Sequence, residues 1–163
     1  IFSLMEHLEI ERKFLVTDDG FKQQATSQTR IVQGFLNTDP ERTVRVRIKG
    51  EKGFLTIKGP SNDSGTTRFE WETEITASEA TNLIDLCESG ILEKVRFEVP
   101  WGNHLFEVDE FVGENKGLVI AEVELKHEDE RFEKPNWLGE EVTGQVPYYN
   151  SQLSIKPFKE WQR

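Results

Sequence analysis

The chain has 163 residues, a length that suits one domain. Its formal net charge of −10 argues against a nucleic-acid binder, because such proteins need a basic surface to displace counterions. A small polyphosphate is not excluded, since it responds to the local field of a cleft more than to the net charge. The single cysteine, Cys87, excludes an internal disulfide and a cysteine-rich zinc site.

The sequence shows no signal peptide and no apolar run long enough to span a membrane. We therefore expect a soluble protein in the reducing cytoplasm. The only methionine is Met5, so we interpret residues 1–4 as an N-terminal overhang and residues 5–163 as a single domain.

Alternation of polar and apolar residues with a period of two recurs along the chain and predicts strands. The expected strands are 6–16, 28–36, 43–49, 53–59, 66–75, 91–99, 104–112 and 117–125. A helix is expected over 77–88, with Thr76 or Ser78 as its N-cap and Gly90 as its stop signal. Short helices could form at 137–141 and 148–154. This pattern predicts a mainly β fold of the α+β class, either an antiparallel barrel or a sandwich.

Charged residues concentrate on one face of most expected strands, because residues i and i+2 of a strand point to the same side. For any single strand, an ordinary sheet with its charges in bulk water is the alternative. The segregation recurs in strand after strand, so a closed barrel with a charged lumen and an apolar, helix-covered outside fits better. Like charges placed side by side repel unless opposite charge lies between them, which favours a site for divalent metal and a polyanion. The strongest motifs are Glu9-Ile10-Glu11, Arg45-Val46-Arg47 and Glu122-Val123-Glu124.

An ordered set of motifs extends from about Met5 to Leu153. It comprises Glu9-Ile10-Glu11-Arg12-Lys13-Phe14, Arg45-Val46-Arg47, Thr56-Ile57-Lys58-Gly59, Arg68-Phe69-Glu70-Trp71-Glu72, Lys94-Val95-Arg96, Glu107-Val108-Asp109-Glu110-Phe111, Ala121-Glu122-Val123-Glu124-Leu125, Glu140-Glu141-Val142-Thr143 and Tyr148-Tyr149-Asn150-Ser151. This set resembles the CYTH, or triphosphate tunnel metalloenzyme, superfamily, and within it the bacterial inorganic triphosphatase-like subgroup.

The resemblance implies an eight-stranded antiparallel tunnel, with a few flanking helices, that binds a triphosphate and Mg²⁺ or Mn²⁺. Carboxylate oxygens suit such hard cations, and arginine and lysine suit phosphate oxygens. The implied metal ligands are Glu9, Glu11, Asp109, Glu122 and Glu124. The implied phosphate-binding residues are Lys13, Arg45, Arg47, Lys58, Lys94 and Arg96. Catalytic roles are implied for Glu9, Glu11 and Lys13, and a supporting role, in fixing the arginines, for Arg68, Glu70 and Glu72.

Several residues have plainer alternatives. Asp109 could be a surface acid close to a turn, and Arg68 could simply pair with Glu70 or another neighbour. Tyr148 and Tyr149 could belong to a C-terminal helix that closes one tunnel mouth, or could only pack. The remaining candidates are expected outside the site: Arg12 on the outer surface, Phe69 and Trp71 on the outer wall beneath a helix, and His7, His104 and His127 as scattered, non-catalytic side chains.

The expected activity is metal-dependent hydrolysis of inorganic tripolyphosphate to pyrophosphate and phosphate. A class IV-type adenylate cyclase and a thiamine triphosphatase are the alternatives within the resemblance. A non-catalytic polyphosphate-binding module and a purely structural barrel are alternatives of another class. The expected partner is a small-molecule triphosphate, without nucleic acid or membrane, and the chain is expected to be a monomer or a homodimer.

Overall fold

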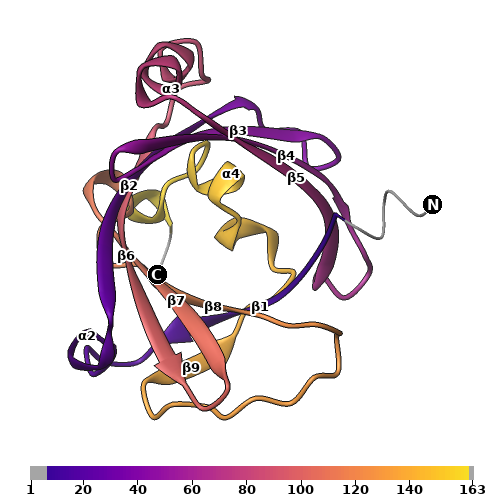
Figure 1. Cartoon of the computed structure of the whole chain (residues 1–163), viewed down its shortest axis with the longest axis vertical. Coiled ribbons are helices and arrows are strands. Elements are labelled where there is room, and N and C mark those ends of the chain that lie inside the picture. Colours follow the sequence, from indigo (N-terminus) through magenta and orange to yellow (C-terminus); the bar gives the residue numbers. More distant parts are fainter. Residues whose placement is uncertain (1–6, 162–163) are drawn as a thin grey trace.

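The strands form one antiparallel sheet that closes into a barrel (Figure 1). The structure, a computed structural model, describes residues 7–161. The expectation for residues 1–4, and that of a first strand starting at residue 6, lie outside the described residues. The strand order is β5-β4-β3-β2-β6-β7-β8-β1-β9, and an additional β5–β1 pairing closes the ring. The expected eight-stranded antiparallel barrel is confirmed, with one extra strand.

The secondary-structure elements have the following bounds. The strands are β1 (Leu8–Val16), β2 (Ser27–Asn37), β3 (Thr43–Lys49), β4 (Lys52–Ser61), β5 (Thr67–Ile75), β6 (Leu92–Trp101), β7 (His104–Phe111), β8 (Val119–Glu124) and β9 (Leu138–Glu141). The α-helices are α2 (Phe21–Gln24), α3 (Ala77–Ile84) and α4 (Asn150–Leu153), and the 3-10 turns are η1 (Gly113–Asn115), η2 (Val146–Tyr148) and η3 (Phe158–Glu160). Within residues 7–161, no helix combines the length and the apolar character that crossing a membrane requires.

Two of the expected helices need correction. The predicted helix over 137–141 is wrong, since residues 138–141 form β9, which pairs with β1. The helix expected over 77–88 exists as α3 but ends at Ile84. Its start is confirmed: the Thr76 side chain accepts from the backbone N–H of Glu79, and the Glu79 side chain accepts from that of Thr76, which is a capping box.

Strand β1 holds the barrel closed because both of its edges are paired. One edge runs along β8, with Glu11 opposite Glu124 and Leu15 opposite Ile120. The other edge pairs first with β5 and then, further along, with β9. Strand β9 therefore takes over the edge of β1 where β5 diverges from it, and no long stretch of β1 is left open.

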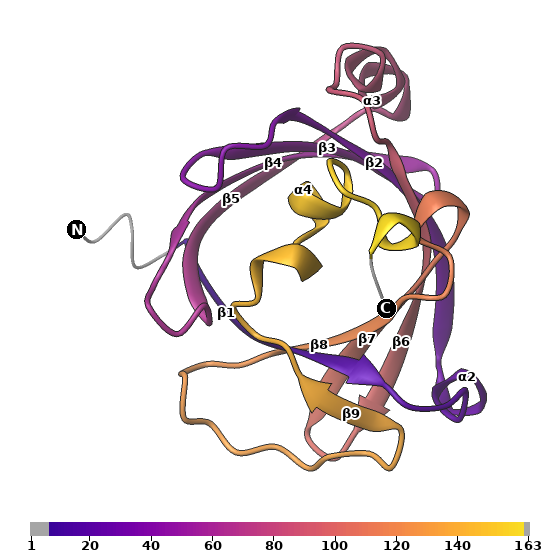
Figure 2. The same ribbon diagram turned by 180° about the vertical axis from the view of Figure 1, so that it is seen from behind.

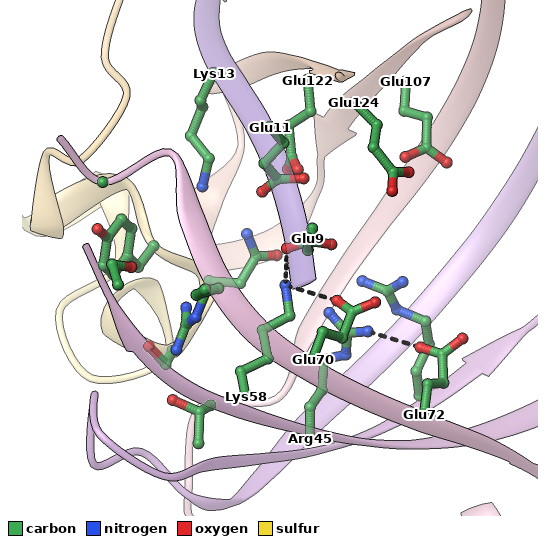
Figure 3. Close-up of a pocket in the computed structure, with 18 of the residues that line it drawn as sticks. Glu9, Glu11, Lys13, Arg45, Lys58, Glu70, Glu72, Glu107, Glu122 and Glu124 are labelled. Carbon is green, nitrogen blue, oxygen red and sulfur yellow. Dashed lines mark hydrogen bonds and ion pairs between the residues drawn. The ribbon is translucent and has the colours of Figure 1, made fainter. Parts of the chain in front are cut away.

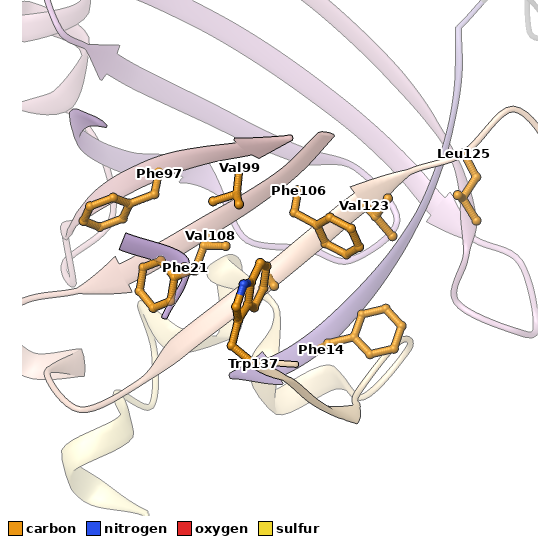
Figure 4. Packing of buried hydrophobic residues seen from close by; sticks show 10 residues of the cluster. Phe14, Phe21, Phe97, Val99, Phe106, Val108, Val123, Leu125 and Trp137 are labelled. Carbon is orange, nitrogen blue, oxygen red and sulfur yellow. The ribbon is translucent and has the colours of Figure 1, made fainter. Parts of the chain in front are cut away.

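The main apolar core lies outside the barrel, between its wall and the segments that cover it. Phe14, Phe106 and Val123 point outward from β1, β7 and β8, and Trp137 and Phe21 pack on them (Figure 4). The indole Nε1 of Trp137 also donates to Gln24 Oε1 at 2.8 Å, which ties the segment before β9 to the end of α2. This core follows from the alternation, which sends the apolar residues of each strand away from the lumen.

Helix α3 covers part of the outer wall of the barrel. It packs over β2, β3 and β4, and Gly53 permits the approach, since a Cβ there would lie 2.7 Å from the Cβ of Ala80. Trp71 on β5 points outward as expected but remains 38% exposed. The prediction that Trp71 lies beneath a helix is therefore wrong.

The C-terminal segment lies inside the ring of strands, where both views show α4 (Figures 1 and 2). Leu153 is fully buried there among Phe35, Leu92, Phe111 and Ile120, all of which point into the lumen. The ring of Tyr148 packs edge-on against Trp161 at the same end. Of the two alternatives for this segment, the structure favours closure of one tunnel mouth.

The buried indole of Trp137 predicts a large loss of stability on truncation. Trp137→Ala should lower the free energy of unfolding by about 3–5 kcal/mol, because it opens a cavity between α2 and the barrel wall. Trp71→Ala is the matched control, since this indole is partly exposed, and should cost under about 1 kcal/mol. Urea unfolding of both variants measures the difference, and equal losses would contradict the outer core described here.

Candidate active site

The lumen contains a cavity of about 290 Å³ that carries most of the charge of the barrel (Figure 3). Strand alternation places these side chains in the lumen, because each strand turns its charged face inward. Every site residue predicted from the sequence, except Asp109, lines the cavity: Glu9, Glu11, Lys13, Arg45, Arg47, Lys58, Arg68, Glu70, Glu72, Lys94, Arg96, Glu122 and Glu124.

Carboxylates crowd one side of the cavity. Glu11 on β1 lies opposite Glu124 on β8, and Glu122 lies opposite Glu107 on β7. Burial, followed by the charges of Glu122 and Glu9, raises the pKa of Glu11 well above its usual value. Burial opposes ionisation of Glu122 too, but Lys13 and a hydrogen bond with Glu11 lower its pKa to about 2. The Glu11–Glu122 pair therefore favours one shared proton when no cation lies between the two groups.

Lys58 bridges the acidic side to β5. Its Nζ lies 3.0 Å from Glu9 Oε1 and 3.2 Å from Glu70 Oε2 (Figure 3). Burial and a hydrogen bond with Glu9 raise the pKa of Glu70 to about 7. Burial would raise the pKa of Glu9 too, but the charge of Lys58 and its hydrogen bonds outweigh burial and lower it. Lys58 thus pairs with two carboxylates, of which Glu9 stays ionised and Glu70 binds a proton more readily.

Arg45 has a buried donor without a partner. Its Nη2 donates to Thr56 Oγ1 at 3.0 Å and lies 3.4 Å from Glu72 Oε2, while the Thr56 hydroxyl donates to the same Glu72 oxygen. Among residues 7–161, the Nε of Arg45 is the one buried side-chain nitrogen or oxygen that has no hydrogen-bond partner. An unpaired buried N–H is costly, so this atom is suited to an anion in the cavity.

Asp109 lies behind the cavity wall, where two cations enclose it. Arg96 donates to both of its oxygens, at 2.8 and 2.9 Å, and Lys94 Nζ lies 2.7 Å from Oδ2. Burial would raise the pKa of Asp109, but Arg96 and Lys94 prevail and hold it well below its usual range. Asp109 is only 1% exposed, so the alternative of a surface acid is wrong. The arrangement suits a partner that orients Arg96 and Lys94 better than a metal ligand.

Three residues without an expected role, Glu107, Gln33 and Asn150, also contact the site, and so does Tyr149, for which closure of a tunnel mouth or packing was expected. Glu107 lies 3.3 Å from Arg96 Nη1, and Gln33 accepts from Arg47 Nε at 2.9 Å. Tyr149 lies with its ring 5.3 Å from Lys13 Nζ, and Asn150 accepts from Lys94 Nζ at 2.9 Å. Glu107 could have been found from its position two residues before Asp109 on one strand.

The remaining expectations concern residues at the edge of the site or outside it. Arg68 lines the cavity but donates to the carbonyls of Gly59 and Pro40, not to a carboxylate. Arg12 points outward, as expected, and forms an ion pair with Glu141 at 2.6 Å. None of the three histidines lines the cavity.

The acidic side of the cavity fits a divalent cation bound together with an anion. Glu9, Glu11, Glu122 and Glu124 share the cavity wall, and Glu11 and Glu124 have raised pKa values, mainly through burial and then through neighbouring carboxylates. Within residues 7–161, no three acidic, histidine or cysteine side chains form a ready-made metal cage. Mg²⁺ rarely needs one, since it usually binds through one or two carboxylates, several waters and the phosphates of a substrate.

Comparison with known proteins identifies relatives over almost the whole chain. The model of the CYTH domain family matches residues 7–153. An inorganic triphosphatase of Acetivibrio thermocellus is 44% identical over 94% of this chain and 97% of its own. An inorganic triphosphatase of Nitrosomonas europaea is 36% identical over 90% of this chain and 97% of its own. The crystal structure of an inorganic triphosphatase superposes with a TM-score of 0.63 at 34% identity, covering 90% of this chain and 94% of the other.

The raised pKa of Glu70 predicts a pH-dependent stability of the metal-free protein. Since its pKa rises from 4.5 to about 7 on folding, the folded state holds the proton more tightly, and the resulting stabilisation is lost as the pH rises towards 7. Glu70→Gln should therefore raise the free energy of unfolding at pH 8 by on the order of 1 kcal/mol and change it little at pH 5. Glu74→Gln, an exposed change on the same strand, is the control for urea unfolding in EDTA. Equal effects of Glu70→Gln at both pH values would rule out the raised pKa.

Proposed function

Because the chain belongs to the CYTH domain family, we propose that it hydrolyses inorganic tripolyphosphate to pyrophosphate and phosphate with a divalent cation. The names of the two curated relatives support this substrate. The observation that carries the proposal is one cavity in which a group of cations faces a group of carboxylates. A linear triphosphate carries several negative charges, and such a molecule with its cation balances both sides of this cavity.

The cations of the cavity are proposed to hold the phosphate oxygens. Arg45 has the clearest case, because its buried Nε has no partner among the described residues and a phosphate oxygen would satisfy it. Burial, together with the neighbouring Arg45 and Arg96, lowers the pKa of Arg47, so an anion between these arginines relieves their mutual repulsion. The proposed phosphate-binding set is Lys13, Arg45, Arg47, Lys58, Lys94 and Arg96.

Mg²⁺ or Mn²⁺ is proposed as the cation, held by carboxylates of β1 and β8. The proposed ligands are Glu9, Glu11, Glu122 and Glu124; Asp109, which was expected to join them, is proposed instead to orient Lys94 and Arg96. When bound, the cation supplies charge neutralisation on the phosphates and polarisation of the attacking water. Glu9 and Glu11 together with Lys13 border the space where water and phosphate meet, and the lysine holds the phosphate there as a point charge.

Neutralising a lumenal carboxylate should remove activity while the fold persists. Glu11→Gln or Glu124→Gln should lower kcat for tripolyphosphate on the order of 100-fold and weaken metal binding about 10–100-fold, because each change removes one charged ligand. Glu51→Gln, in the exposed β3–β4 turn, is the matched control. Phosphate release at several Mg²⁺ concentrations gives both quantities. Wild-type rates in either lumenal variant would sink the proposed metal site.

The cavity also predicts the order of substrates. All of its proposed contacts address phosphate oxygens, so kcat/KM should be highest for tripolyphosphate, lower for ATP and thiamine triphosphate, and no cyclic AMP should form. Arg45→Ala should depress turnover of all three, since the lost contact is to their common part. Initial rates on each substrate with Mg²⁺ measure this. Cyclic AMP formation would move the chain to the cyclase alternative, and a preference for thiamine triphosphate would indicate an aromatic subsite.

A further inference from the structure

The side chain of Asn150, at the start of α4, connects the C-terminal segment to the cations of the cavity. Its Oδ1 accepts from Lys94 Nζ at 2.9 Å and from Gln33 Nε2 at 2.8 Å. Gln33 in turn accepts from Arg47 Nε at 2.9 Å. Arginine can only donate hydrogen bonds, so Arg47 fixes which end of the Gln33 amide is the oxygen, and Gln33 Nε2 then fixes that of Asn150. The orientation of the Asn150 amide is therefore determined by the network around it.

This orientation leaves the amide nitrogen of Asn150 as an unused donor. Asn150 lines the cavity, and within the described part of the chain its Nδ2 has no hydrogen-bond acceptor. Lys94 Nζ already contacts Asp109 Oδ2 and donates to Asn150 Oδ1, so it does not serve this N–H as an acceptor. Asn150 Nδ2 is therefore a free donor at the cavity wall, and a phosphate held by the same cations offers it an acceptor.

Beyond Asn150 and Ser151, which both line the cavity, the lumen becomes apolar. Leu153, one turn further along α4, is fully buried against Leu92, Phe111 and Ile120, which occupy the next inward positions of their strands. Ionised phosphate cannot be placed among these apolar side chains without a large desolvation cost. A phosphate chain can therefore reach Asn150 with its end but cannot continue past it.

We propose that Asn150 is a substrate-binding residue that recognises the terminal, unesterified phosphate group of a linear triphosphate, an inference that rests on the proposed function. Its Nδ2 donates to an oxygen of that group. Its Oδ1 holds Lys94, and through Gln33 also Arg47, beside the same group. A terminal phosphate that carries an ester is rejected, because the ester group would have to enter the apolar end.

The variant Asn150→Asp tests the donor of the side chain separately from its acceptor. The aspartate keeps an oxygen for Lys94 and Gln33 but replaces the amide N–H groups with a second, anionic oxygen. The Kd for tripolyphosphate, measured by calorimetry in EDTA, and the KM with Mg²⁺ should both rise on the order of 10–100-fold, while the melting temperature is kept. A residue that only positioned Lys94 would show no more than the effect of the added charge. Ser151→Asp adds the same charge to the same helix and also lines the cavity, so it measures that effect and should raise the Kd several-fold less.

Each result has a distinct meaning. A wild-type Kd in Asn150→Asp, or equal losses in the two variants, would overturn the inference but not the proposed hydrolysis. Binding that depends on Asn150 without hydrolysis of any triphosphate would overturn the proposed function and support the site. If the wild type neither binds tripolyphosphate in EDTA nor hydrolyses it with Mg²⁺, both are overturned.

The wild-type protein provides a second test that needs no variant. With Mg²⁺, ATP is compared with a dinucleoside triphosphate, in which adenosine is esterified to both ends of the same chain. ATP can present a free terminal phosphate and the diester cannot, so kcat/KM for the diester should be at least about tenfold lower. Equal rates would show that the cavity accepts an esterified end and would overturn the inference.

Discussion

Burial of like charges in one narrow lumen is the constraint on which the rest of this structure depends. Glu11, Glu122 and Glu124 face one another on one side, and Arg45, Arg47 and Arg96 on the other. Ion pairs such as Lys58–Glu9 offset part of the desolvation cost, yet buried pairs of this kind add little net stability. The interior therefore stores unfavourable electrostatic energy, which ligand binding can relieve.

The stability of the barrel consequently comes from its outside and from one end. Phe14, Phe106 and Trp137 form an apolar layer on the outer wall, and Leu153 anchors the C-terminal segment in the lumen. This inverts the usual order, in which the inner face of a small barrel is its core. It also separates folding from chemistry, since substitutions in the outer layer act mainly on folding and substitutions of the lumenal charges act mainly on the chemistry.

Alternation made the strands and the lumenal charges predictable, because a period of two assigns every residue of a strand to one side. It could not identify β9, whose four residues show no periodicity and whose pairing with β1 depends on a partner more than a hundred residues away. Alternation correctly assigned Asp109 to the inward side of its strand, but only the structure shows that Arg96 and Lys94 enclose it. Gln33 and Asn150 carry no charge pattern, and Asn150 lies in an irregular segment, so their roles depend on tertiary contacts alone.

The pairing of β1 has a consequence for how the chain reaches its native state. One edge of β1 pairs with β8, and part of its other edge pairs with β9, so that Leu15 lies opposite Ile120 and Phe14 opposite Glu141, far along the sequence. Only Leu8–Ile10 have an earlier partner, in β5. During synthesis β1 therefore waits, with an unpaired edge, until nearly the whole chain has left the ribosome. Contacts between residues so far apart in sequence slow folding and leave unpaired, aggregation-prone strand edges exposed for longer. Closure of the ring is accordingly a late event, and a partly made chain is the form most prone to aggregation.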